Sequence, residues 1–149
     1  MSEVLLIKSK QEMSEFAKSL TPIQDSASGI QKIICLNGTL GMGKTFFAKE
    51  FIGSLLDEKE EVTSPTFNLL NIYDTKLGEI FHFDLYRLKN EDELENIGFF
   101  DAIKNGICLI EWPQVAKQYL TNYVNVEIKT NNLDNPEERE VVITHVNNS

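Results

Sequence analysis

A glycine-rich stretch that ends in a lysine and a threonine is the part of the sequence best suited to chemistry. It follows an apolar run and matches the pattern G-x-x-x-x-G-K-[ST] with the residues Gly38, Thr39, Leu40, Gly41, Met42, Gly43, Lys44 and Thr45. Glycines allow positive φ angles and close approach of the backbone, so amide N–H groups can surround phosphate oxygens. The stretch therefore predicts a nucleotide-binding loop, in which Lys44 contacts the β- and γ-phosphates and Thr45 ligates Mg²⁺.

Two acidic residues end apolar runs and are candidates for a second magnesium-linked or catalytic carboxylate. Glu111 follows the run 107–110, and Asp84 ends the run that begins at Ile80. Open α/β sheets bind ligands at the carboxyl ends of their strands, which is where both acids are expected. Either acid could position the attacking water, and either could instead cap the next helix.

A hydroxyl-rich segment, residues 63–66, precedes an expected strand. Nucleotide switches carry a γ-phosphate sensor at this place in the chain, which makes Thr63, Ser64 and Thr66 candidate nucleotide contacts. Ser, Thr and Pro also form ordinary turns. Trp112, next to the second acid, could belong to the core, cover the site or meet a partner.

The elements expected around these residues alternate between strands and helices. Continuous apolar residues predict buried strands at 33–36 and 106–110. Helices are expected over the ranges 11–20, 43–56 and 90–94, and further strands over 4–7, 67–73, 80–84, 123–129 and 139–146, with a hairpin turn at Gly78. This order predicts an α/β fold, specifically a P-loop NTPase-like three-layer sandwich with a mixed, largely parallel central sheet.

Length and charge limit the remaining classes of protein. The 149 residues are enough for a single domain, 1–149, and the excess of 23 acidic over 14 basic residues gives a formal charge of −9. Nucleic-acid binding usually depends on Lys and Arg, so we expect no direct contact with nucleic acid and a role through protein partners.

The sequence also indicates the compartment. With no membrane-length apolar run or signal peptide, and with Cys35 and Cys108 inside apolar runs, we expect a cytoplasmic protein with reduced core cysteines. Neither His82 nor His145 receives a catalytic assignment.

Five ordered blocks of the chain carry a resemblance to a known family. They are GTLGMGKT, VTSPTFNLLNIY, FHFDLYRL, ELENIGFFDAI and ICLIEWPQVA. With these blocks the sequence resembles the TsaE (YjeE) family of bacterial P-loop ATPases. The resemblance implies slow hydrolysis of ATP with Mg²⁺, in the formation of N6-threonylcarbamoyladenosine (t6A) in tRNA. It also implies TsaD and TsaB as protein partners, and the acidic charge argues against direct contact with the tRNA.

The resemblance also implies roles for single residues. It gives Lys44 the phosphate contact, Thr45 and Glu111 the magnesium contacts, Asp84 a place as a catalytic-site carboxylate, Thr63–Thr66 the switch, Trp112 a place near the active site, and Ser9 and Lys10 a place near the base. Two positions depart from the family pattern. Thr39 stands where family members commonly have an acid, a difference that bears on the charge near the γ-phosphate and so on the rate of turnover. Met42 stands where they commonly have alanine, and its larger side chain is expected to point away from the phosphates.

Three other functions fit part of the pattern. A small-molecule kinase would need cationic groups around the transferred phosphoryl group, and the chain has only two arginines, Arg87 and Arg139. A GTPase would be expected to carry an N-K-x-D tetrapeptide, which is absent from the sequence. A nucleotide-gated interaction module without significant hydrolysis would bind ATP as an ATPase does but would release no significant phosphate.

Overall fold

The computed structural model describes residues 2–21, 32–38, 43–57, 60–130 and 137–147. The strands are β1 (Ser2–Ile7), β2 (Lys32–Asn37), β3 (Leu70–Thr75), β4 (Gly78–Asp84), β5 (Ile107–Glu111), β6 (Asn122–Thr130) and β7 (Arg139–Asn147). The helices are α1 (Lys10–Ser19), α2 (Lys44–Leu55), α3 (Asp92–Asn96) and α4 (Phe99–Asn105), and short 3-10 helices cover Pro113–Val115 and Lys117–Tyr119. None of the helices in these ranges is long and apolar enough to cross a membrane.

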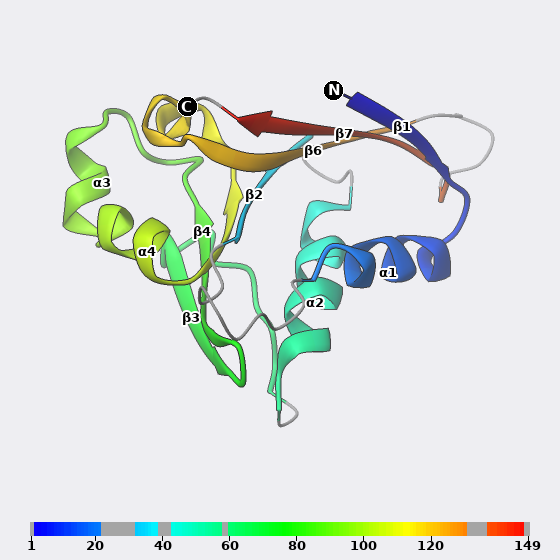
Figure 1. The fold of residues 1–149 in the computed structure, drawn as a ribbon, viewed down its shortest axis with the longest axis horizontal. Coiled ribbons are helices and arrows are strands. Elements are labelled where there is room, and N and C mark those ends of the chain that lie inside the picture. The colour runs from blue at the N-terminus through cyan, green and yellow to red at the C-terminus, as the bar shows by residue number, and fades with distance from the viewer. Residues whose placement is uncertain (1, 22–31, 39–42, 58–59, 131–136, 148–149) are drawn as a thin grey trace.

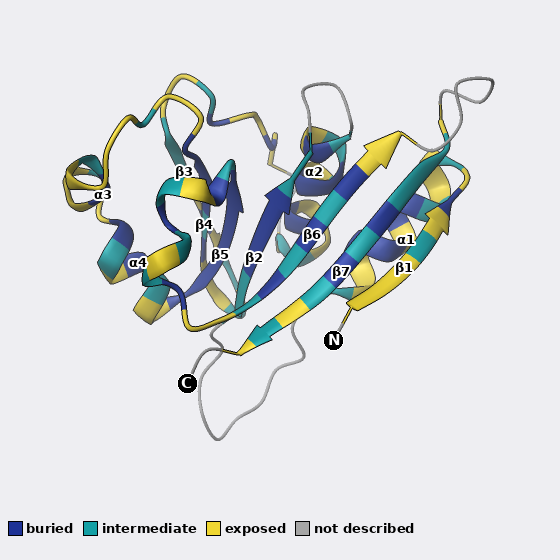
Figure 2. Ribbon diagram, turned by 90° about the horizontal axis from the view of Figure 1, so that it is seen from above, coloured by how far each residue is buried: buried dark blue, intermediate teal, exposed yellow. Residues whose placement is uncertain are grey.

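All seven of these strands join in one mixed sheet. Their order is β1-β7-β6-β2-β5-β4-β3 (Figure 2). The four central strands, β6, β2, β5 and β4, are parallel to one another. At one margin β3 pairs antiparallel with β4, and at the other β7 pairs antiparallel with both β6 and β1. The predicted α/β fold with a parallel centre is therefore confirmed, and the carboxyl ends of β2, β4 and β5 lie next to each other along one edge.

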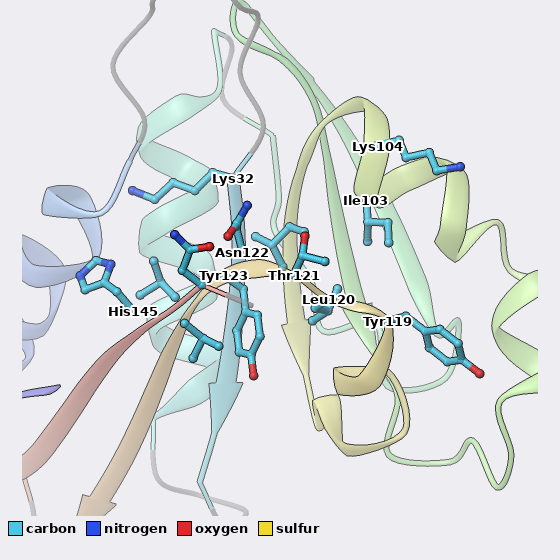
Figure 3. A pocket seen from close by; sticks show the side chains of 13 residues that line it. Lys32, Ile103, Lys104, Tyr119, Leu120, Thr121, Asn122, Tyr123 and His145 are labelled. Carbon is cyan, nitrogen blue, oxygen red and sulfur yellow. The ribbon is translucent and has the colours of Figure 1, made fainter. Parts of the chain in front are cut away.

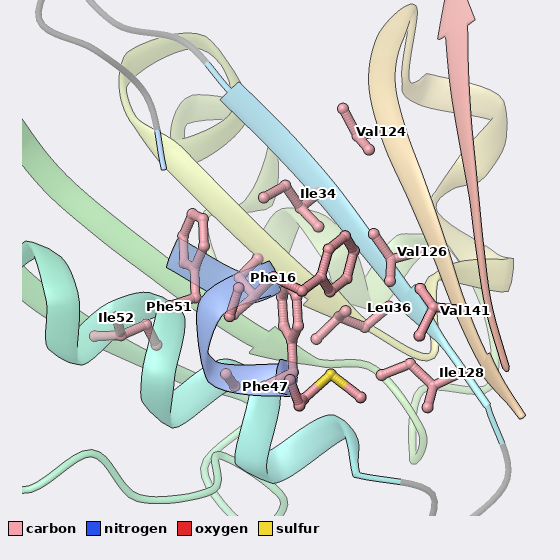
Figure 4. Packing of buried hydrophobic residues seen from close by; sticks show 14 of the residues in the cluster. Phe16, Ile34, Leu36, Phe47, Phe51, Ile52, Val124, Val126, Ile128 and Val141 are labelled. Carbon is pink, nitrogen blue, oxygen red and sulfur yellow. The ribbon is translucent and has the colours of Figure 1, made fainter. Parts of the chain in front are cut away.

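Helices α1 and α2 cover one face of the sheet, behind β2, β6 and β7 in Figure 2. Figure 4 shows how three phenylalanines from these helices meet Ile34 and Leu36 of β2. The Phe47 ring lies 5.7 Å from the Phe16 ring and 6.1 Å from the Phe51 ring, between centroids. Since every one of these side chains is less than a tenth exposed, this packing fixes α2, and with it Lys44, against the sheet.

Helices α3 and α4 pack over the other face, at the β3–β4 side of the sheet (Figure 1). The Phe83 and Phe99 rings meet edge to face with centroids 5.2 Å apart. Cys35 and Cys108 are buried in this second cluster as free thiols, and burial raises the pKa of each to about 12. The prediction of reduced core cysteines is confirmed.

The sequence analysis misplaced one element on this side of the sheet and missed another. We predicted a strand from Phe67, but β3 begins at Leu70, because the Asn68 and Leu69 amides donate to the Pro65 carbonyl and close a turn. Leu69 lies at φ 68°, which is incompatible with a continuing strand. The sequence analysis also missed α4. The predicted hairpin turn is correct, with Gly78 at φ 108°.

Candidate nucleotide site

The register of the parallel strands brings the predicted acids together. Glu111 at the end of β5 is the register partner of Asp84 on β4 and of Leu36 on β2, so three strand ends are level. Asp84 and Glu111 are each 4% exposed. Neither acid caps the helix that follows it, because no side-chain cap is formed at α3 or at the 3-10 helix 113–115. This edge is where β2 leads into the glycine-rich stretch.

The structure describes the first and the last glycine of the glycine-rich stretch, Gly38 and Gly43, and both have positive φ angles that favour glycine. Gly38 lies at φ 150° and Gly43 at φ 103°. A Cβ on Gly43 would meet no atom of the described residues within 4 Å, so the requirement there is the left-handed backbone and not space. α2 begins at the next residue, with the Thr45 side chain exposed in its first turn. The predicted contacts Thr39, Leu40, Gly41 and Met42 lie outside the described residues.

Among the described residues, the environment of Lys44 gives the clearest indication of a bound ligand. Its side chain is 5% exposed, and its Nζ has no hydrogen-bond partner in the described part of the chain. Desolvation lowers the pKa of this ammonium below its usual value, and the nearby carboxylates of Glu111 and Asp84 counter that shift. A buried cation without a hydrogen bond is costly, and phosphate oxygens would supply the missing partners. The residues present therefore fit a polyphosphate.

Trp112 supplies the ring that Lys44 now contacts. The ammonium lies 3.6 Å from the centroid of the indole, a cation–π contact. Trp112 has φ 55°, an unusual backbone for a bulky residue, and its ring also meets the Tyr86 ring at 4.8 Å. The structure therefore places Trp112 beside Lys44, the candidate phosphate contact.

Asp84 is linked to the predicted switch. Its Oδ2 accepts a hydrogen bond from Thr66 Oγ1 at 3.0 Å, and its Oδ1 accepts one from the Tyr86 amide at 3.0 Å. The Ser64 hydroxyl lies 2.6 Å from the Thr66 hydroxyl. Thr63 is turned to the hairpin instead, where its amide donates to Tyr73 Oη. One end of the predicted switch therefore contacts the site, and the other end does not.

Glu111 has a partner that the sequence analysis did not identify. His82 Nε2 lies 2.7 Å from Glu111 Oε2, and His82 is 1% exposed. The available signal was periodicity, because His82 stands two residues before Asp84 on β4 and must share its face of the sheet. His82 is buried, and its ring contacts Glu111 of β5.

Two hollows flank the candidate site. One of about 510 Å³ is lined by Asn37, Gly38, Trp112, Gln114 and residues 127–130. A smaller one of about 100 Å³ lies beside the start of α2 and is lined by Ser9, Lys10, Met13, Gly43, Phe46, Glu137 and Arg139. The second hollow brings the region that the resemblance placed near the base next to the glycine-rich stretch.

A hollow of about 650 Å³ at the opposite end of β2 and β6 has a different character. Figure 3 shows Lys104 and Tyr119 on its margin, both directed away from its centre. Lys32 Nζ already donates to the Leu20 carbonyl. Because its polar groups do not converge, the carboxyl edge remains the candidate site.

The mixed sheet, with a glycine-rich stretch after β2 that ends in Lys44 and Thr45 at the start of α2, and with buried acids at the neighbouring strand ends, defines a P-loop NTPase-like protein. The model of the family described as "Threonylcarbamoyl adenosine biosynthesis protein TsaE" matches residues 7–141. The chain belongs to the TsaE family, and the resemblance seen in the sequence is confirmed.

Individual relatives and a solved structure agree with this assignment. The chain is 39% identical over 133 residues to the tRNA threonylcarbamoyladenosine biosynthesis protein TsaE of Rickettsia prowazekii (strain Madrid E), which covers 87% of this chain and 86% of that protein. It is 36% identical over 114 residues to the protein of the same name from Aquifex aeolicus (strain VF5), covering 76% and 78%. The crystal structure of Bacillus subtilis YdiB superposes with a TM-score of 0.70 at 26% identity, over 98% of this chain and 86% of that one.

Proposed function

We propose that this protein is an ATP-binding, slowly hydrolysing accessory ATPase of tRNA t6A modification that acts in the cytoplasm with TsaD and TsaB. Family membership supports the pathway. The observation that carries the ATPase assignment is the buried ammonium of Lys44, which lies at the start of α2 beside two buried carboxylates and lacks a hydrogen-bond partner among the described residues.

The residues divide the work of binding as follows. The backbone amides of residues 38–45 and the Lys44 ammonium hold the β- and γ-phosphates, helped by the positive end of the α2 dipole. The Thr45 hydroxyl and Glu111 hold Mg²⁺, which supplies charge neutralisation at the phosphates when bound. Mg²⁺ takes much of its coordination from phosphate and water, so a protein cage is not needed; the described residues contain no cluster of three or more His, Cys, Asp or Glu suited to one.

Asp84 and Glu111 differ in how many of their carboxylate oxygens already accept a hydrogen bond. Both oxygens of Asp84 already accept hydrogen bonds, one from Thr66 and one from the Tyr86 amide. Glu111 has one oxygen engaged, by His82, which leaves Oε1 for the metal or for the attacking water. We therefore assign Glu111 to the magnesium and water side of the reaction, and Asp84 to holding the switch near the γ-phosphate.

This arrangement gives the switch a way to report the nucleotide. Hydrogen bonds connect Ser64 through Thr66 to Asp84. Phe67, the next residue, is 81% exposed and carries the Arg87 guanidinium 4.7 Å from its ring centroid. ATP would order residues 63–66 and present this surface to TsaD and TsaB, and hydrolysis would release it. The base would occupy the small hollow beside Ser9 and Lys10.

Phosphate release tests this function directly. The purified protein with Mg·ATP, alone and with TsaD and TsaB, should release phosphate slowly, and repeated rounds of tRNA modification should require the protein. Nucleotide binding without any phosphate release, in either mixture, would replace the ATPase by a nucleotide-gated interaction module. Transfer of phosphate to a small molecule would favour a kinase.

The fluorescence of Trp112 should report nucleotide binding. It is the only tryptophan in the chain, and the Lys44 ammonium lies against its ring. Phosphate oxygens that draw this ammonium away remove a cation from the indole face, so Mg·ATP should produce a saturable change in emission. A titration with free tryptophan corrects for absorbance by ATP. Binding seen by calorimetry with unchanged emission would show that Lys44 stays on the ring.

A further inference from the structure

His82 is a polar residue in a place where packing alone would favour an apolar one. Its register partner on β5 is Leu109, and Ile80 precedes it by two residues on the same face of β4. Its Nδ1 is buried without a hydrogen-bond partner among the described residues. Burying a ring nitrogen in this way costs stability, so the imidazole calls for a function beyond filling space.

That function is visible at the other ring nitrogen. Nε2 donates to Glu111 Oε2 at 2.7 Å, and both side chains are almost completely buried. This hydrogen bond holds one oxygen of the Glu111 carboxylate in place. A carboxylate held at one oxygen loses rotational freedom about its terminal torsion, and its second oxygen is then presented in a fixed direction.

We infer that His82 is a positioning residue for Glu111: its Nε2–H fixes Oε2 so that Oε1 is held ready for the magnesium ion or a magnesium-bound water. This inference rests on the proposed ATPase function, because it takes the metal role of Glu111 from there. Hydrogen-bond partners of metal ligands typically change metal affinity or activity by about 10- to 100-fold when they are removed. His82 itself touches neither nucleotide nor metal.

Two amide substitutions separate positioning from packing. In His82→Gln the side-chain amide nitrogen can take the place of Nε2, whereas in His82→Asn the amide is too short and replaces only Nδ1. His145→Asn, on the exposed part of β7, is the matched control. We expect Mn²⁺, used in place of Mg²⁺ and followed by electron paramagnetic resonance with ADP present, to bind about 10-fold or more weakly to His82→Asn. His82→Gln and the control should bind it nearly as the wild type does.

Two further measurements make the result specific. ADP affinity in EDTA should be the same in all four proteins, because the phosphate contacts of Lys44 are intact. In a Glu111→Gln background, His82→Asn should cause no further loss of hydrolysis, since it acts through the carboxylate that has been removed. Additive losses in that background, or equal Mn²⁺ affinities for His82→Asn and wild type, would overturn the inference. Failure of the wild-type protein to bind any nucleotide would instead overturn the proposed function.

Discussion

Replacement of Lys44 by methionine should reduce ATP hydrolysis by about 10²-fold or more, because loss of one preorganised group that stabilises transition-state charge typically has that effect. The same substitution should stabilise the nucleotide-free protein. Methionine keeps most of the length of the side chain but removes a buried ammonium that has no hydrogen-bond partner among the described residues. An unsatisfied buried donor costs about 1–3 kcal/mol, so urea unfolding should show a gain of that order.

The gain in stability of the Lys44→Met variant should decrease as the pH rises. Burial lowers the pKa of Lys44 in the folded protein, while the unfolded chain keeps the usual value near 10.5. Between these two values the unfolded chain binds more protons, so the stability of the wild type rises with pH there. The advantage of Lys44→Met should therefore be complete below the folded-state pKa and should shrink as the pH approaches 10.5.

Lys49→Met provides the control, since Lys49 lies on the same helix with an exposed side chain. It should change neither hydrolysis nor stability. Repeated rounds of tRNA modification supported by Lys44→Met would contradict the proposed role of the nucleotide. A loss of stability in the nucleotide-free variant would show that the ammonium is paired in solution.

The sequence predicted the centre of the fold well and its margin less well. Strands β2 and β5 were predicted as continuous apolar runs, because parallel strands at the centre of a sheet are buried on both faces. The start of β3 was misplaced because Phe67 has strand propensity, yet the turn closed by the Pro65 carbonyl exposes it. α4 was missed because its seven residues are too few to show a helical period.

The same distinction applies to the candidate site. Lys44, Asp84 and Glu111 could be placed at one edge from the sequence because strand ends in a parallel sheet meet there. The contacts between side chains could not. The pairing of His82 with Glu111, the Thr66 hydrogen bond to Asp84 and the Lys44 contact with Trp112 depend on register and on backbone angles, such as φ 55° at Trp112, that no local pattern specifies.

Glu111→Gln should separate binding of ATP from its hydrolysis. Glutamine keeps the shape of the side chain, and its amide oxygen can still accept from His82, so the fold and the phosphate contacts should survive. The charge that would serve Mg²⁺ or the attacking water is lost. Hydrolysis should fall by about 10²-fold or more, while ATP affinity measured by calorimetry changes little.

A comparison with Asp84→Asn decides how the two acids divide their roles. Asparagine can still accept one hydrogen bond, so the link to either Thr66 or the Tyr86 amide can persist, and we expect Asp84→Asn to disturb the switch and the coupling to TsaD and TsaB more than the intrinsic hydrolysis. Glu79→Gln, exposed near the start of β4, is the neutral control. Wild-type turnover in Glu111→Gln together with a large loss in Asp84→Asn would reverse the assignment, because the acid that holds the switch would then also be the one that acts on water.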